Sequence, residues 1–194
     1  MNEENGAETV LLSGQRVYKD DERVKVCGIV DEISCHIGVV KSFLERGDEV
    51  SEILTRIQGQ LFALGSQISA LGSETKTPTV TQEDLDFLDQ VIQTYGKSLP
   101  KLTSFIYPGG SRAAAFLHLA RAAARRGERA IVALSRRFPI DPKILAYVNK
   151  LSSALFVLAR YVNFREGLGD ETWNKILSGD DCGIYGGRPG WAKS

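Results

Sequence analysis

The chain has 194 residues, a length that suits one domain with a substantial buried core. Its 24 Lys and Arg residues balance 24 Asp and Glu residues, so no overall charge favours nucleic acid or a membrane surface as a partner. No apolar run approaches the roughly 18 residues that span a bilayer, and the acidic first ten residues do not resemble a signal peptide. We therefore expect a soluble cytoplasmic protein that binds neither nucleic acid nor membrane.

The cysteines support the same location. Cys27, Cys35 and Cys182 are odd in number and lack the CxxC spacing of a zinc or redox site. On one helix, Cys27 and Cys35 would lie about 12 Å apart, which is too far for a disulfide. Reduced thiols are typical of the cytoplasm.

The first segment, residues 1–21, has scattered Gly, Thr and Ser and no sustained hydrophobic period. We expect a loop arm that becomes ordered only against another surface. No part of the chain alternates apolar and polar residues over a useful length, and its Asn-Gly pair lies in this arm rather than between apolar runs. No β-hairpin is therefore expected.

Five later segments repeat apolar residues at spacings of three and four, which predicts five helices. Thr81 with Asp84 is typical of a helix start, as is Asp141 followed by Pro142. The helical segments are 24–45, 53–68, 81–95, 111–137 and 141–164.

Short connections between these helices favour antiparallel neighbours. The expected fold class is all-α, a five-helix, ferritin-like, up-and-down bundle. We divide the chain into an N-terminal arm (1–21), a helical bundle domain (22–166) and a Gly-rich C-terminal tail (167–194), whose Tyr185 and Trp191 could dock on a partner.

The segment 111–137 is unusual because arginines crowd its second half. Arg121, Arg125 and Glu128 share one face of the helix, and guanidinium groups in such a row can hold a polyphosphate. The alternative is a solvated face with ion pairs inside the helix, although the many alanines of this segment suit tight packing. The arginines are Arg121, Arg125, Arg126, Arg129, Arg136 and Arg137.

Two shorter features also suggest a site. The stretch FIYPGG, residues 105–110, precedes the arginine helix, and its glycines could let backbone N–H groups approach an anion. An ordinary turn into the helix explains the same residues. Asp31 and Glu32 lie within the apolar stripe of the first helix, where a carboxylate near the core needs a cationic partner; Arg121 could supply it.

Common nucleotide and metal motifs are absent. The sequence has no GxSxG, GxGxxG or Walker motif. Neither His36 nor His118 follows a glutamate by three residues, so no di-iron cage is predicted, and the pair Glu32 and His36 makes at most half a site. We expect His118 to be a packed core or interface histidine.

Several blocks together resemble the ATP:corrinoid adenosyltransferases of the trimeric propanediol-utilisation type. They stand in the order of that family, and they span roughly residues 14–166. Two are specific, namely Arg125-Arg126-Gly127-Glu128-Arg129 and Tyr147-Val148-Asn149-Lys150-Leu151-Ser152. The blocks are 16–17, 19–21, 28–32, 64–66, 105–110, 121, 125–129, 147–152 and 155–163.

The resemblance implies a homotrimer that holds ATP between adjacent subunits, with the arm of one subunit and the arginine helix of the next. It places Phe105 beneath the corrin ring, where it would displace the lower ligand of cobalt. It pairs Asp31 with Arg121 in a salt bridge across the interface, on the corrinoid side. The residues implied in catalysis are Arg125, Arg121, Asp31 and Phe105. The residues implied in ATP binding are Thr9, Lys19, Arg125, Arg126, Glu128, Arg129 and Asn149, with Mg²⁺ on the ATP phosphates near Glu128.

The implied reaction transfers the 5′-deoxyadenosyl group of ATP to the cobalt of a reduced corrinoid such as cobalamin, and releases triphosphate. Cobalt(I) is itself the nucleophile, which explains why no catalytic triad or metal cage is needed. A corrinoid reductase and a coenzyme-dependent mutase would be natural partners.

The arm departs from the family. Members begin with Thr-Gly-Asp-x-Gly-x-Thr, of which this chain keeps at best Gly6 and Thr9, and Ser153 stands where an Asp is common. These differences leave two alternatives open. One is a corrinoid carrier or sensor with weak or no ATP turnover, and the other is a structural bundle that binds neither ligand.

Overall fold

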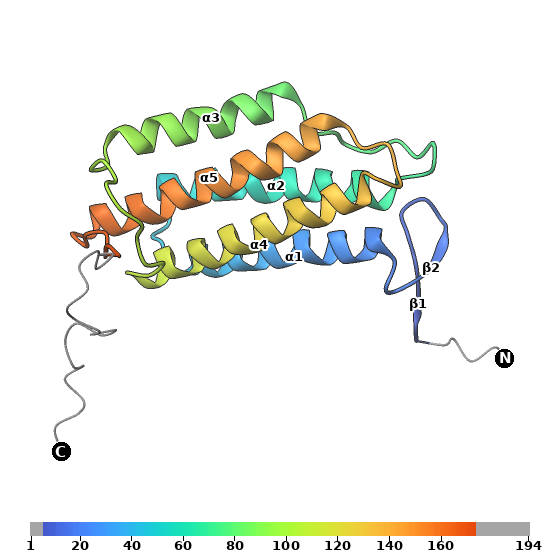
Figure 1. The fold of residues 1–194 in the computed structure, drawn as a ribbon, viewed down its shortest axis with the longest axis horizontal. Coiled ribbons are helices and arrows are strands. Elements are labelled where there is room, and N and C mark those ends of the chain that lie inside the picture. Colours follow the sequence, from blue (N-terminus) through green and yellow to red (C-terminus); the bar gives the residue numbers. More distant parts are fainter. Residues whose placement is uncertain (1–5, 174–194) are drawn as a thin grey trace, which may run out of the picture.

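The computed structural model describes residues 6–173. The predicted tail beyond Trp173, with Tyr185 and Trp191, lies outside the described residues. Two short strands are followed by five helices (Figure 1). The elements are β1 (Glu8–Val10), β2 (Arg16–Tyr18), α1 (Glu22–Ser42), α2 (Glu49–Ser69), α3 (Gln82–Lys97), α4 (Arg112–Leu134) and α5 (Pro142–Arg165).

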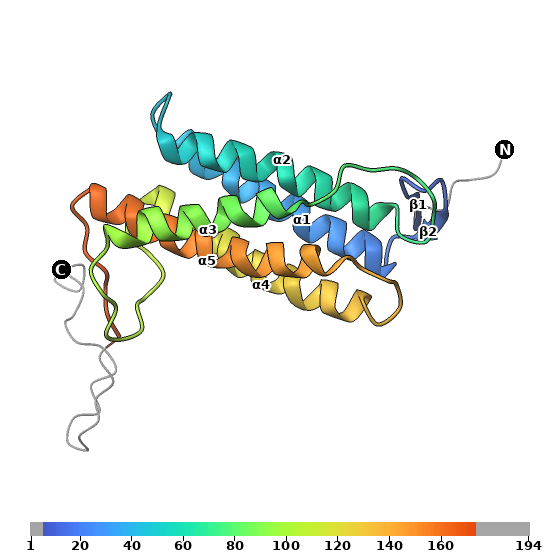
Figure 2. The same cartoon turned by 90° about the horizontal axis from the view of Figure 1, so that it is seen from above.

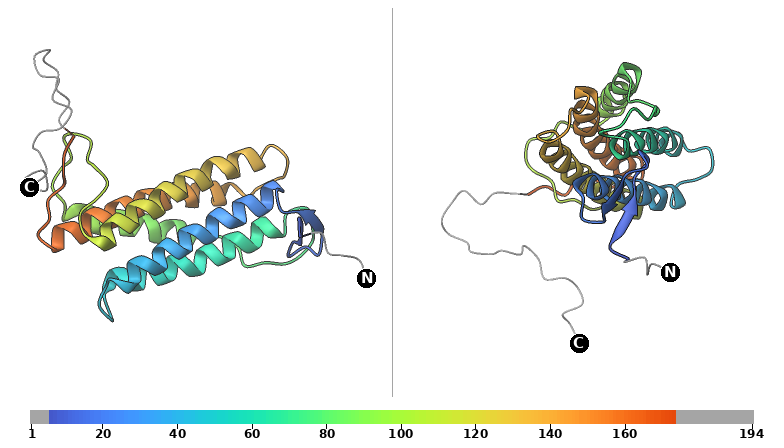
Figure 3. Two further views of the ribbon diagram at one scale, coloured as in Figure 1. Left: turned by 90° about the horizontal axis from the view of Figure 1, so that it is seen from below. Right: turned by 90° about the vertical axis from the view of Figure 1, so that its right-hand side faces the viewer.

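Consecutive helices alternate in direction along one long axis, which confirms the up-and-down bundle (Figure 1). Helix α4 packs extensively against both α1 and α5, while α2 lies on α1 and α3 on α5. Seen from above, α3 runs beside α5 on the outside of the bundle (Figure 2). The end-on view shows the five helices gathered round one core (Figure 3).

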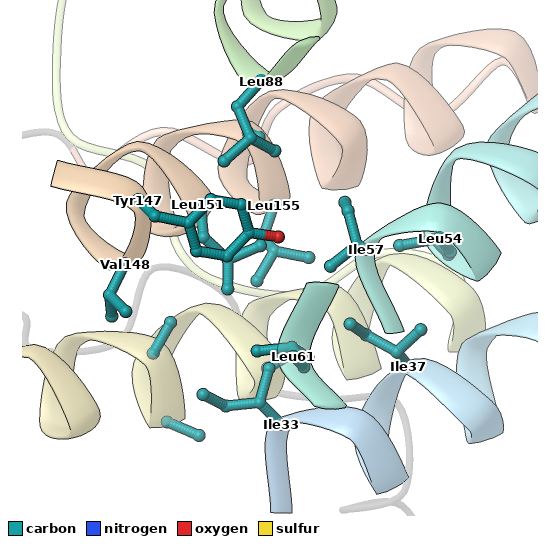
Figure 4. Close-up of a cluster of buried hydrophobic side chains, with 14 of the residues drawn as sticks. Ile33, Ile37, Leu54, Ile57, Leu61, Leu88, Tyr147, Val148, Leu151 and Leu155 are labelled. Carbon is teal, nitrogen blue, oxygen red and sulfur yellow. The ribbon is translucent and has the colours of Figure 1, made fainter. Parts of the chain in front are cut away.

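The predicted apolar stripes form that core. Ile33 and Ile37 of α1 face Ile57 and Leu61 of α2, and side chains of α3 and α5 close the cluster from above (Figure 4). All are almost fully buried, and each such side chain contributes about 1.5 to 3 kcal/mol. The buried Tyr147 hydroxyl donates to Gln60 Oε1 at 2.7 Å, so the core holds no unpaired phenol there.

The predicted helix starts at Thr81 and Asp141 are confirmed. Thr81 and Asp84 form a capping box, and the Asp141 side chain accepts from the backbone N–H of Lys143. Helix α1 starts two residues earlier than predicted, because Asp21 caps it. Helix α4 ends at Leu134 rather than Arg137, ahead of the helix-breaking Pro139.

The prediction that the arm is a loop without strands is wrong, although the rest of the described chain is a five-helix bundle as the all-α class predicts. Strands β1 and β2 pair antiparallel, with Thr9 opposite Val17. Gly14 has φ of +80°, which a residue with a side chain rarely adopts, and it lies in the turn between the strands. Each strand has three residues, too few to show a period of two in the sequence.

Two further predictions concern the whole described segment. Cys27 and Cys35 are both free thiols, as their spacing predicted. Among the described helices, none has a stretch both long and apolar enough to cross a bilayer.

Candidate active site

Helix α4 carries half of the predicted site residues, and its alanines determine how its arginines are presented. Ala113, Ala114, Ala120, Ala123 and Ala124 are buried against α1 and α5. Small side chains on this face let the helices approach closely, and the arginines Arg125, Arg126 and Arg129 lie on the exposed side of α4. Both interpretations of this helix therefore hold, because one face packs through alanines and another exposes arginines to solvent.

Three arginines of the row, Arg125, Arg126 and Arg129, are exposed. Arg126 forms an ion pair with Glu32 of α1. Among the described residues, neither Arg125 nor Arg129 has a carboxylate within salt-bridge distance. Two guanidinium groups thus remain free to bind an anion such as phosphate.

Glu128 does not pair with a neighbouring arginine. Its Oε1 instead accepts a hydrogen bond of 2.8 Å from Asn149 Nδ2 of α5. Asn149 is exposed and Glu128 is half-buried, so this pair presents oxygen atoms beside the arginine row. In the described segment, no three His, Cys, Asp or Glu side chains lie together as metal ligands.

A cavity of about 640 Å³ opens between the α3–α4 connection and helices α4 and α5. Phe105, which is 79% exposed, and Arg121 both line it, so the structure brings these two predicted residues together. His118 and Phe156 complete its inner wall. The cavity thus joins an exposed aromatic ring, an apolar wall and one cationic side chain.

Two nitrogen atoms near this cavity are buried and have no hydrogen-bond partner among the described residues. They are Arg121 Nε and His118 Nδ1. Burial lowers the pKa of Arg121, and the neighbouring Arg125 lowers it further. Burial, followed by the charge of Arg121, lowers the pKa of His118 to about 4, so its imidazole is neutral at pH 7. His118 is packed as predicted, edge-on to Phe156, but it is not hydrogen-bonded at Nδ1.

The loop that carries Phe105 is held by the segment after α5. Tyr107 N–H donates to the Glu171 carbonyl at 2.8 Å, and Trp173 N–H donates to the Phe105 carbonyl at 2.7 Å. The rings of Phe105 and Trp173 lie 6.2 Å apart. The first residues of the predicted tail therefore pack on the candidate site.

The two glycines before α4 form a turn into the helix and not an open anion cradle. Asn163 Oδ1 accepts from the backbone N–H of Ser111, and Asn163 Nδ2 donates to the Gly109 carbonyl, both at 2.9 Å. Gly110 has φ of +101°, and a Cβ there would collide with the Asn163 side chain. The sequence analysis assigned no role to Asn163. The feature that could have pointed to it is a polar amide placed among apolar residues near the end of α5.

Asp31 is exposed, so the prediction that it lies near the core of its own subunit is wrong. It lines a separate hollow of about 300 Å³ between α1 and α2, together with Leu12 and Phe62. Within one chain Asp31 does not meet Arg121. The neighbouring carboxylate, Glu32, is the one that pairs with the arginine helix.

The arm lies at the opposite end of the bundle from the connection between α3 and α4, which carries Phe105 (Figure 1). Thr9 pairs in the β-ladder, and Lys19 is exposed. Glu22 pairs with Arg137 and Glu32 with Arg126, so the start of α1 lies about 15 Å along the axis from the arginine row. One chain alone therefore does not bring the arm to Arg125, Arg126 and Arg129.

Arg23 anchors the arm, a role that sequence reasoning missed. Its guanidinium, almost fully buried, donates to Asp21, to Gln15 Oε1 at 2.9 Å and to the Leu71 carbonyl at 3.1 Å. It also lies 4.9 Å from the centre of the Phe138 ring. Its position could have predicted that it is buried, because Arg23 stands three residues before Val26 and extends the buried stripe of α1.

Known proteins with this arrangement form one class. The family model for cobalamin adenosyltransferase matches residues 2–162. A corrinoid adenosyltransferase from Bacillus subtilis is 39% identical over 168 residues, which cover 84% of this chain and 86% of that protein. The human corrinoid adenosyltransferase MMAB is 35% identical over 170 residues, which cover 84% of this chain and 68% of that protein.

A solved structure agrees with these relatives. A variant of the PduO-type ATP:corrinoid adenosyltransferase from Lactobacillus reuteri, complexed with cobalamin and ATP, superposes with a TM-score of 0.83 at 32% identity. The match covers 88% of this chain and 96% of that one. The chain belongs to the cobalamin adenosyltransferase family, which confirms the resemblance of its sequence blocks.

Proposed function

We propose that this protein transfers the 5′-deoxyadenosyl group of ATP to the cobalt of a reduced corrinoid, and that cobalamin thereby becomes adenosylcobalamin. Family membership and relatives complexed with cobalamin and ATP support this function. The observation that carries it in this chain is the cavity that joins Phe105 to the unpaired Arg121, beside the free guanidinium groups of Arg125 and Arg129.

The chemistry requires alignment and charge rather than a protein nucleophile. The electron pair of cobalt(I) attacks C5′ of ATP, and the bond from C5′ to the triphosphate oxygen breaks, so negative charge grows on the leaving triphosphate. Arg125, Arg126 and Arg129, with Lys19 of the arm, stabilise that charge. Thr9, Glu128 and Asn149 complete the ATP contacts.

Magnesium ions would accompany ATP rather than reside in the protein. Mg²⁺ prefers oxygen ligands and usually binds through few carboxylates together with substrate phosphates. The carboxylate of Glu128, held by Asn149 beside the arginine row, fits this role. The ion would neutralise phosphate charge there.

On the corrinoid side, Phe105 supplies an apolar surface beneath the corrin ring. An apolar neighbour excludes the water or base that would otherwise bind cobalt from below. Asp31 and Arg121 from adjacent subunits form the salt bridge that shapes this side. In support, Arg121 Nε has no hydrogen-bond partner within residues 6–173 of its own chain, and Asp31 is exposed on another helix.

The assembly that joins these halves is a homotrimer. A head-to-tail interface repeated round a ring brings two different faces of one chain together at each contact. Exposed apolar side chains, among them Leu12, Phe62 and Leu119, suit such contacts. The protein works in the cytoplasm, where a corrinoid reductase supplies its substrate and a coenzyme-dependent mutase uses its product. Its division into arm (1–21), bundle (22–166) and tail (167–194) belongs to this proposal.

The experiment that tests the function supplies purified protein with ATP, Mg²⁺ and a chemically reduced corrinoid. We expect a light-sensitive adenosyl product, and the Arg125→Ala variant should lower kcat at least about a hundredfold, because it removes a donor to the leaving triphosphate. Arg112→Ala is the matched control, because Arg112 is an exposed arginine at the far end of the same helix.

A wild-type rate equal to that of the protein-free mixture would refute the function. Calorimetry then identifies the alternative that remains. Tight corrinoid binding without ATP binding indicates a carrier or sensor, and binding of neither ligand indicates a structural bundle.

A further inference from the structure

The loop that presents Phe105 is held from beneath by two residues of α5 that lie one turn apart. Asn163 holds its end at Gly109 and Ser111. Arg160 holds its beginning, because Arg160 Nη2 donates to the Pro100 carbonyl at 2.7 Å. Arg160 is 7% exposed, so this contact is shielded from water.

The same guanidinium also binds the segment that pairs with the loop. Arg160 Nε donates to Asp170 Oδ1 at 3.1 Å and to Oδ2 at 3.0 Å, and Arg160 Nη2 donates to Oδ2 at 2.7 Å. Asp170 immediately precedes the residues that bond to the backbone of Phe105 and Tyr107. We define residues 105–107 and 171–173 as the Phe105 ribbon. One side chain therefore joins Pro100, five residues before the first ribbon segment, to Asp170, which directly precedes the second.

Arg160 does not line the cavity itself. Its guanidinium lies 6.0 Å from the centre of the Phe156 ring, which does line the cavity. Any influence of Arg160 on a ligand must therefore pass through its neighbours, the ribbon above all.

We propose that Arg160 is a positioning residue for the corrinoid, which fixes Phe105 at its place in the cavity by bridging Asp170 and Pro100. The inference rests on the proposed function, in which Phe105 lies beneath the corrin ring. A planar guanidinium is required, because its fixed fork of donors can bind a carboxylate side-on and a carbonyl at once, whereas an ammonium group is a point charge without that geometry.

The test is the Arg160→Lys variant, assayed with corrinoid and ATP varied separately. We expect the KM for corrinoid to rise about tenfold, as for the loss of one charge-assisted hydrogen bond, and the KM for ATP to stay within about twofold. Asp170→Asn keeps the size of the side chain and should likewise raise the KM for corrinoid but not the KM for ATP. It serves as the second variant if Arg160→Lys does not fold.

The matched control is Arg165→Lys. Arg165 also lies on α5 and pairs with an aspartate, Asp48 at 2.6 Å, but this pair ties α5 to the start of α2 and not to the Phe105 loop. We expect both KM values to be unchanged. Equal rises in the two KM values for Arg160→Lys, an unchanged corrinoid KM, or the same split in Arg165→Lys would overturn the proposal.

Amide hydrogen exchange without substrates separates this inference from the proposed function. The N–H groups of Tyr107 and Trp173 both donate within the ribbon. They should exchange faster in Arg160→Lys than in the wild type, and unchanged exchange would refute the positioning role. A wild-type protein that makes no adenosyl product would refute only the function.

Discussion

At the scale of single residues, two of the three buried side-chain atoms that find no hydrogen-bond partner in the described part of the chain belong to residues of the site. A buried donor or acceptor without a partner costs about 1 to 3 kcal/mol. Arg121 Nε and His118 Nδ1 both have this cost, and both side chains line the cavity of Phe105. Such residues do not stabilise the isolated chain, so we interpret them as groups kept for a ligand or for a neighbouring subunit.

His118 makes the stability of the protein depend on pH. Its pKa is lowered to about 4 in the folded protein, against 6.5 for the ordinary group, so the unfolded chain takes up a proton first as the pH falls. Stability is fully present above about pH 6.5 and declines toward pH 4. Between pH 7 and 5 the loss from this one group is about 2 kcal/mol.

Replacing His118 by Gln should flatten that decline. The measurement is urea unfolding at pH 7 and at pH 5, at one protein concentration because an oligomer's apparent stability depends on it. His36→Gln, which changes the other histidine, should keep the wild-type decline. If the stability of His118→Gln falls as much between pH 7 and pH 5 as that of the wild type, then His118 is not the group responsible.

At the scale of elements, the turn before α4 depends on one glycine. We expect Gly110→Ala to lower the free energy of unfolding by about 1 to 3 kcal/mol and to weaken corrinoid binding. The reason is the φ of +101° at Gly110, together with the collision of a new Cβ with Asn163.

Gly109→Ala is the control, because a Cβ at that position meets nothing within 4 Å and its φ is ordinary. Urea titration and the visible absorbance of bound corrinoid measure the two effects. Equal stability of the two variants would contradict this account of the turn.

The helices could be predicted from the sequence because their signals are local. The stripe of Ile33 and Ile37 and the cap at Asp141 each depend on residues within a few turns. The hairpin of the arm could not be predicted, because strands of three residues are too short to show a period of two. The pairing of Ile106 with Thr172 could not be predicted, because the two residues lie far apart along the chain. For the same reason the sequence pointed to Phe105 but not to Asn163 or Trp173, which hold it in place.

At the scale of the whole molecule, the predicted site residues fall into separate groups. Arg121 and Phe105 share one cavity, and Asp31 lines a different hollow. Lys19 belongs to the arm, which lies at the far end of the bundle from the connection between α3 and α4. A single chain provides both halves of a site without joining them. Our central claim is that neighbouring copies join them, each copy giving its arm and Asp31 to one site and its arginine helix to another.

Mixing two inactive variants tests this claim most directly. Asp31→Ala and Arg125→Ala, unfolded together in equal amounts and refolded, would form mixed copies of the proposed trimer, in which some interfaces join the intact Asp31 of one subunit to the intact Arg125 of the next. Random assembly makes about a quarter of all interfaces intact in a head-to-tail ring. We predict adenosyl transfer at about a quarter of the wild-type rate, and a rate no higher than the mean of the two variants refolded separately would contradict the claim.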